Sequence, residues 1–156
     1  RERLFLKKII HFISAIKNIP AKDRREIIDK INDSGEFRVK VGEKLLYIID
    51  RCDDHEKAKL IAQMFSAFVS GKLSYNEFLR SSSIIDRLMI EDIAWFIDNG
   101  ENLYLWESLG DLVNSGLFTI NIVNPADGDH KVPDGTELHA SITDIGQKML
   151  EVLKLC

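Results

Sequence analysis

The stretch "SITDIGQKMLEVL", residues 141–153, decides the architecture expected for the C-terminal half of this 156-residue chain. Thr143 stands directly before a run whose apolar residues recur at helical spacing, so its hydroxyl predicts the N-cap of a closing helix. The residues just before it, "ELHASI" (137–142), alternate apolar and polar side chains, as a strand with one buried face does. The chain is therefore expected to finish with a strand and a helix.

The preceding stretch, "LWESLGDLVNSGLFTINIV" (105–123), predicts a helix and then another strand. A helical apolar spacing covers residues 102–115, and Gly116 follows as its C-terminal cap. In residues 118–123 apolar and polar side chains alternate, which indicates a half-buried strand. The intervening "NPADGDHKVPDG" holds two prolines and two Asp-Gly steps, so the two strands are expected to form a hairpin around this loop.

The order helix, glycine stop, strand, loop, strand, helix resembles the C-terminal two-thirds of a winged-helix domain. "LVNSGLF" and "ITDIGQKMLEVL" are similar to the stretches that flank the wing in bacterial winged-helix regulators. The resemblance covers about residues 86–155 and implies a DNA-reading fold. The same order also fits a helix–hairpin–helix addition to a helical bundle.

The charges of this half oppose DNA binding by the usual winged-helix face. A groove-entering helix and its wing need lysine or arginine against phosphate. Residues 102–115 contain neither, and the wing carries a single lysine among acidic residues. We therefore expect an acidic protein-interaction surface here, made of Glu107, Asp111, Asp127, Asp129, Lys131 and Asp134.

The N-terminal part predicts a bundle of four or five helices. Helical apolar spacing covers residues 4–19, where Pro20 ends the run, and then residues 21–31, 37–52, 53–71 and 74–100. Ile13 and Leu46 are among the residues expected to face inward.

Local signals mark the ends of these helices. The pairs Asp53–Glu56 and Ser74–Glu77 have capping-box spacing, and Gly71 and Gly100 are expected to end helices. The serine triplet 81–83 is expected to break or bend the last helix.

The charge is distributed unevenly. Residues 1–83 hold 17 Lys+Arg against 12 Asp+Glu, a net +5, whereas residues 84–156 hold 4 against 13, a net −9. The first helix interleaves basic with apolar residues, so it fits either the solvent-facing wall of a bundle or an interfacial helix on anionic lipid. The expected basic membrane or nucleic-acid surface comprises Arg1, Arg3, Lys7, Lys8, Lys17, Arg24 and Arg25.

The sequence contains only weak matches to metal-binding or catalytic motifs. "SGKLSYNEFL" resembles half of a calcium-binding EF-hand loop, but Phe68 stands where a ligand is needed, so we expect a helix stop and a cap instead. "RCDDHE" (51–56) is expected to cap a helix junction rather than to catalyse. The sequence has no nucleotide-binding glycine motif, nucleophile elbow or zinc-ligand spacing. We expect no catalytic residue, metal or cofactor.

The cysteine count and the distribution of apolar residues indicate which cellular environment suits the chain. Cys52 and Cys156 are too few for a disulfide framework, which favours a reducing environment. No apolar stretch approaches the roughly 18 residues of a membrane span. The chain starts at Arg1 without a methionine, so we expect a piece of a longer protein, with a membrane contact upstream of Arg1 as one option.

These observations predict a mostly α protein: a helical bundle (1–85) packed on a winged-helix-like half (86–156) as one continuous globule, because no Gly/Ser/Pro-rich linker separates them. The function expected first is a non-enzymatic protein–protein interaction or regulatory domain, binding a partner or a second copy, in a bacterial cytoplasm or at the cytoplasmic face of a membrane. The alternative is a nucleic-acid-binding transcriptional regulator that uses the basic N-terminal half. An enzyme of unrecognised type is the third.

Overall fold

The computed structural model describes residues 2–17, 19–32, 35–100, 109–123 and 137–154. Within them the protein is mostly helical, with one two-stranded antiparallel sheet. In chain order the elements are α1 (Glu2–Ile16), α2 (Ala21–Asn32), α3 (Gly35–Arg51), α4 (His55–Val69), α5 (Tyr75–Arg87), α6 (Ile90–Asn99), α7 (Leu109–Ser115), β1 (Phe118–Val123), β2 (Glu137–Ile142) and α8 (Asp144–Lys154).

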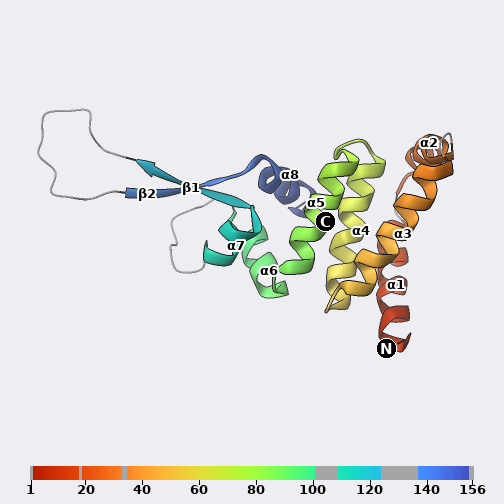
Figure 1. The fold of residues 1–156 in the computed structure, drawn as a ribbon, viewed down its shortest axis with the longest axis horizontal. Coiled ribbons are helices and arrows are strands. Elements are labelled where there is room, and N and C mark those ends of the chain that lie inside the picture. Colours follow the sequence, from red (N-terminus) through yellow and green to blue (C-terminus); the bar gives the residue numbers. More distant parts are fainter. Residues whose placement is uncertain (1, 18, 33–34, 101–108, 124–136, 155–156) are drawn as a thin grey trace, which may run out of the picture.

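Helix α4 is central to the helical body, where it contacts α1, α2, α5 and α8 (Figure 1). Its inward positions Ala58, Ile61, Ala62 and Met64 are fully buried. The two alanines have short side chains, which lets neighbouring helices approach α4 closely. No helix in the described ranges combines the length and the apolar character that crossing a bilayer requires.

Local signals set the limits of α4 and α5. Gly71 adopts a positive φ of 77° after α4, which confirms the predicted stop. The Ser74 hydroxyl accepts from the Glu77 amide and the Glu77 carboxylate accepts from the Ser74 amide, so the predicted capping box is confirmed. The predicted Asp53–Glu56 box is wrong. Asp54 is the N-cap instead, because its side chain accepts from the Glu56 amide at 2.7 Å.

The serine triplet 81–83 does not break the helix, contrary to the prediction. Ser81 and Ser82 lie fully buried inside α5, and the Ser81 hydroxyl donates to the Phe78 carbonyl. That bond satisfies a buried hydroxyl within the helix, so the segment stays helical. The break comes later, at Leu88, whose extended ψ of 152° separates α5 from α6.

The predicted hairpin is confirmed, with Phe118 paired to Ile142 and Ile120 to Ala140. Gly116 has a positive φ of 93° between α7 and β1, as its C-cap role requires. The Thr143 hydroxyl accepts from the Gly146 amide at 3.1 Å and donates to the Gly116 carbonyl at 2.7 Å. It therefore caps α8 and also fixes the start of β1 against that helix.

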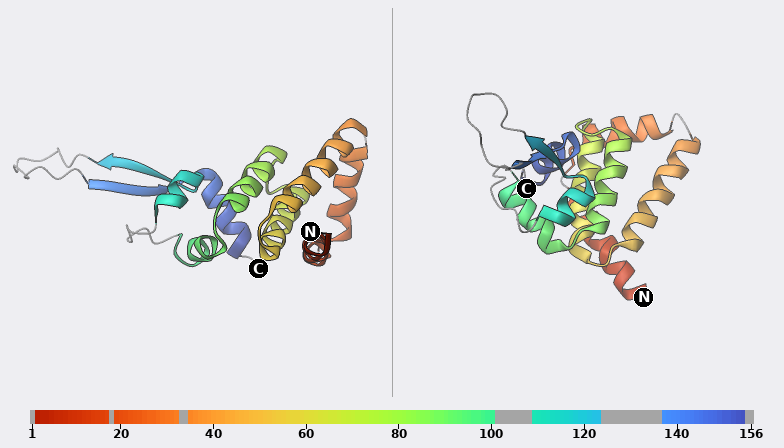
Figure 2. Two further views of the ribbon diagram at one scale, coloured as in Figure 1. Left: turned by 60° about the horizontal axis from the view of Figure 1, so that its bottom comes forward. Right: turned by 60° about the vertical axis from the view of Figure 1, so that its left-hand side comes forward.

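The hairpin projects away from the helical body (Figures 1 and 2). At the base of the hairpin Phe118 is 2% exposed, whereas Ile120, two residues further along β1, is 48% exposed. The expected buried face of this strand is therefore confirmed at Phe118 and wrong at Ile120, and no other described strand covers β1.

One cluster of buried side chains runs through the helical body and reaches the base of the hairpin. It includes Ile61 of α4 and Ile85 of α5 together with Phe96 of α6, Phe118 of β1 and Met149 of α8. The Phe96 and Phe118 rings meet edge to face, with centroids 5.7 Å apart. Residues on both sides of position 85 therefore contribute to the same core.

Two residues expected to face inward are exposed. Ile13 of α1 is 48% and Leu46 of α3 is 52% exposed to solvent. Both helices carry more apolar residues than their packed sides accommodate, so these two side chains stay about half exposed.

Candidate interaction surfaces

The expected acidic surface is described only at Asp111. Glu107, Asp127, Asp129, Lys131 and Asp134 lie outside the described residues, as does the 102–108 part of the predicted helix. Asp111 is exposed on α7. It lines a cavity of about 290 Å³ between α7 and the α5–α6 junction, together with Arg87 and Met89.

Arg87 connects the two sides of this cavity. Its guanidinium donates to the Ser115 carbonyl at 3.4 Å, at the end of α7. Because that carbonyl belongs to the last turn of a helix, the cation also complements the negative end of the helix dipole. Met89, beside it, exposes 66% of its surface, so the cavity has an apolar rim next to Asp111.

The expected basic surface is exposed at Arg3, Lys7, Lys17 and Arg25. Arg1 lies outside the described residues, and Arg24 belongs to α2. The four exposed residues lie on or beside α1 and α2, at the opposite end of the molecule from the hairpin (Figure 1).

Lys8 does not belong to this surface, which corrects the prediction. Its side chain is buried, and its ammonium donates to the Asp50 carbonyl at 2.7 Å. That carbonyl lies in the last turn of α3, where a cation satisfies a free acceptor and the helix dipole. The spacing of four residues between Lys8 and the buried Phe12 was the signal that both share one helix face.

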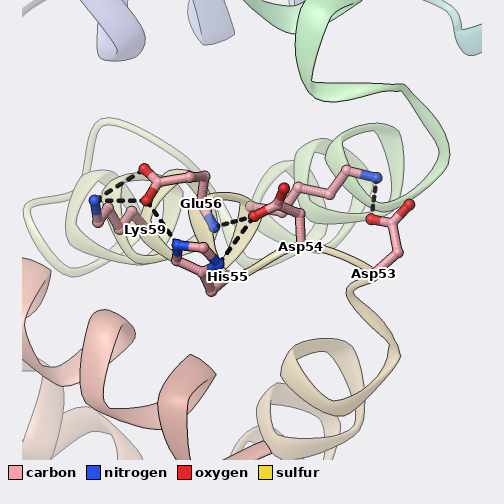
Figure 3. Close-up of polar contacts among 6 residues, drawn as sticks. Asp53, Asp54, His55, Glu56 and Lys59 are labelled. Carbon is pink, nitrogen blue, oxygen red and sulfur yellow. Dashed lines mark hydrogen bonds and ion pairs between the residues drawn. The ribbon is translucent and has the colours of Figure 1, made fainter. Parts of the chain in front are cut away.

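The "RCDDHE" segment is a helix junction held by polar contacts (Figure 3). The Asp53 carboxylate accepts from the buried Lys57 ammonium at 2.6 Å, and this hydrogen bond lowers the pKa of Asp53. Lys57 also donates to the Asp86 carbonyl at 3.2 Å. The carboxylate and ammonium thus join α4 to the end of α5 and stabilise the start of α4.

The side chains of Asp54, His55 and Glu56 also make polar contacts. Glu56 accepts from Lys59 at 2.8 Å, which lowers the pKa of the Glu56 carboxyl. His55 lies between Asp54 and Glu56, and its ring lies 4.6 Å from that of His11 on α1. Desolvation lowers the pKa of His11, with the neighbouring His55 as the next cause. His11 and His55 are 44 residues apart in the sequence, so no local pattern predicts that their rings meet.

Cys52 is arranged as a packing residue. Its thiol is buried and donates to the Ile48 carbonyl at 3.3 Å. Burial raises the pKa of this thiol to about 11, so little thiolate exists near neutral pH. Within the described ranges, no three His, Cys, Asp or Glu side chains come together as metal ligands would.

Several large apolar side chains that were not predicted as surface residues are exposed. They are Leu4, Leu6, Ile10 and Ile13 of α1, Leu46 and Tyr47 of α3, Met89 before α6, and Ile120 of β1. A helical wheel of α1 could have shown that its apolar residues exceed what a single buried face can hold.

Comparisons with protein-family models, curated proteins and solved structures found no match to this chain.

Proposed function

We propose that this chain is a non-enzymatic protein–protein interaction domain whose hairpin β1–β2 contacts the partner. The observation that carries the proposal is the hairpin's position outside the helical body with Ile120 half exposed (Figure 1). A two-stranded ribbon by itself is at best marginally stable in water. A partner that covers the Ile120 face, or adds a strand to the ribbon, would complete it.

We further propose that residues 86–156 are a winged-helix-like unit. The succession α7, β1, β2, α8, with Gly116 and Thr143 at its two turns, supports this assignment. Asp111 is exposed on α7, the helix that would face a duplex, and residues 109–115 contain no lysine or arginine. Such a face favours a protein partner over nucleic acid.

The polar groups of the "RCDDHE" segment support a structural role there. Asp54 caps α4, Asp53 pairs with Lys57, and the Cys52 thiol is buried and protonated near neutral pH. Each of these groups has a partner that stabilises the fold, which agrees with a domain that binds without catalysing.

Site-specific photocrosslinking tests the proposal. A photoreactive phenylalanine derivative would replace Ile120 in one variant and Thr119, exposed on the other face of the same strand, in the control. In the source cells, the variant at position 120 should give a discrete protein adduct, which protease removes and nuclease does not. An adduct of twice the chain's mass would identify a second copy as the partner. Equal or absent crosslinking at both positions would contradict the proposal.

The nucleic-acid alternative predicts a different result. In that case the photoreactive residue in place of Lys7 or Arg25, both exposed in the basic half, would give nuclease-sensitive adducts. Binding of the chain to a duplex in a gel shift would then weaken steeply as salt is raised, because phosphate contacts release counterions.

A further inference from the structure

The outer face of α1 carries a row of apolar side chains that no described element covers. Leu6, Ile10 and Ile13 are 58%, 55% and 48% exposed and follow one another at spacings of four and three residues. This spacing places them on one side of the helix. The packed side is a different one: Lys8 and Phe12 are buried there, against the rest of the bundle.

Basic side chains border this row. Arg3 lies seven residues before Ile10, about two helical turns, so it shares the exposed face. Lys7 lies three residues before Ile10, and Lys17 follows the last residue of α1; all three basic residues are exposed. Glu2 is the only acidic residue in the sequence of α1. The apolar row therefore has a net positive border.

The basic helix α1 and the acidic half of the chain lie in different parts of the molecule. Helix α1 and the hairpin lie at opposite ends of the longest axis (Figures 1 and 2). The half that contains the hairpin is the acidic one, with 13 acidic against 4 basic residues in 84–156.

We propose that α1 lies flat on an anionic phospholipid surface, with Leu6, Ile10 and Ile13 at the acyl boundary and Arg3, Lys7 and Lys17 against the headgroup phosphates. Interfacial helices combine an apolar row with such basic residues, and each basic side chain near the membrane adds to the affinity. A second copy is a poorer occupant, because it would bring the same basic border against this one. This inference does not rest on the proposed role of the hairpin.

Vesicle sedimentation of the whole chain tests the proposal, with phosphatidylcholine vesicles compared to vesicles that also contain phosphatidylglycerol. The chain should bind only the anionic vesicles, and more weakly at high salt. Ile10→Gln should lower binding about tenfold, because it removes one apolar anchor from the interface. Leu46→Gln, an equally exposed leucine on α3, is the matched control and should bind as the unchanged chain does.

A second pair of variants tests the charges. The double change Arg3→Gln with Lys7→Gln should abolish the preference for anionic vesicles and much of its salt dependence, whereas Lys40→Gln, exposed on α3, should leave both unchanged. Because all these side chains are exposed, each variant should melt as the unchanged chain does. Failure to bind anionic vesicles would overturn the proposal, and so would equal losses in Ile10→Gln and Leu46→Gln. A lipid-free dimer that Ile10→Gln dissociates would also overturn it in favour of a second copy.

Discussion

The Lys148 ammonium lies 2.5 Å from the Glu77 carboxylate and thereby joins α8 to the first turn of α5. Glu77 also closes the capping box with Ser74. The hydrogen bond from Lys148, followed by those from Ser74, lowers the pKa of Glu77 to about 2 from its ordinary value of 4.5. A single carboxylate thus stabilises both a helix start and a contact between helices.

Replacing this carboxylate should change the acid stability of the fold. The pKa of Glu77 is lower in the folded than in the unfolded protein. Its contribution to the free energy of unfolding is therefore fully present above pH 4.5 and is lost as the pH falls toward 2. Both side chains are partly exposed, so Glu77→Gln should cost only about 1 kcal/mol near neutral pH. Denaturant unfolding at several pH values checks this result.

The control for this prediction is Glu43→Gln, an exposed carboxylate on α3. Its unfolding curve should follow the unchanged chain across the pH range. If Glu77→Gln lowered the free energy of unfolding by the same amount at pH 3 as at pH 7, the lowered pKa of Glu77 would be contradicted.

Gly146 is where α8 comes close to the chain before β1. A Cβ atom there would lie 2.4 Å from the Leu117 carbonyl oxygen and 2.9 Å from Ile142 Cγ1. Gly146→Ala should therefore destabilise the fold by about 2–3 kcal/mol, as overpacking does. Gly110→Ala in α7 meets no atom within 4 Å, so it should be neutral or stabilising by up to about 1 kcal/mol. Equal thermal melting of the two variants would show that α8 does not approach Leu117 so closely.

Local patterns predicted the parts of this fold that depend on neighbouring residues. The Ser74–Glu77 box, the Gly116 turn, the Thr143 cap and the limits of both strands follow from short-range hydrogen bonding and alternation. Such features need little information from the rest of the chain, which is why they could be read from the sequence.

The errors concern residues whose role depends on distant partners. Lys8 is buried because the end of α3, 42 residues along the chain, supplies a carbonyl. The Lys57 ammonium, which pairs with Asp53, is likewise placed by the Asp86 carbonyl 29 residues away. Ile120 is exposed because β1 leaves the body. The candidate surfaces were predicted less well for the same reason: an apolar helix such as α1 does not show in its sequence which side is packed.

Lys57 provides a test of how much a buried ammonium contributes to the free energy of unfolding when its carboxylate partner, Asp53, is exposed. It is almost fully buried and donates to Asp53 and to the Asp86 carbonyl. Lys57→Met keeps the apolar stem but removes both hydrogen bonds, and it should cost about 1–3 kcal/mol. Lys59→Met removes only an exposed pair with Glu56 and should cost at most about 0.5 kcal/mol. Urea unfolding of both variants measures the difference, and a larger loss in Lys59→Met would contradict the role given to Lys57.

The neighbouring aromatic residues Trp95 and Phe96 should differ in what they contribute to stability. Phe96 is fully buried and meets Phe118 edge to face, so Phe96→Ala should cost about 3–5 kcal/mol. Trp95 is only partly buried, so Trp95→Ala should cost clearly less, about 1–3 kcal/mol, although its ring is larger.

Because Phe96 and Phe118 belong to the cluster that also contains Ile61, loss of the Phe96 ring should weaken the whole body at once. Helical circular dichroism and tryptophan fluorescence should then report one coincident unfolding transition, shifted to lower denaturant in Phe96→Ala with an unchanged slope. Two separate transitions would mean that residues 86–156 fold independently of the bundle. A greater loss of stability in Trp95→Ala than in Phe96→Ala would contradict the burial assigned to the two rings.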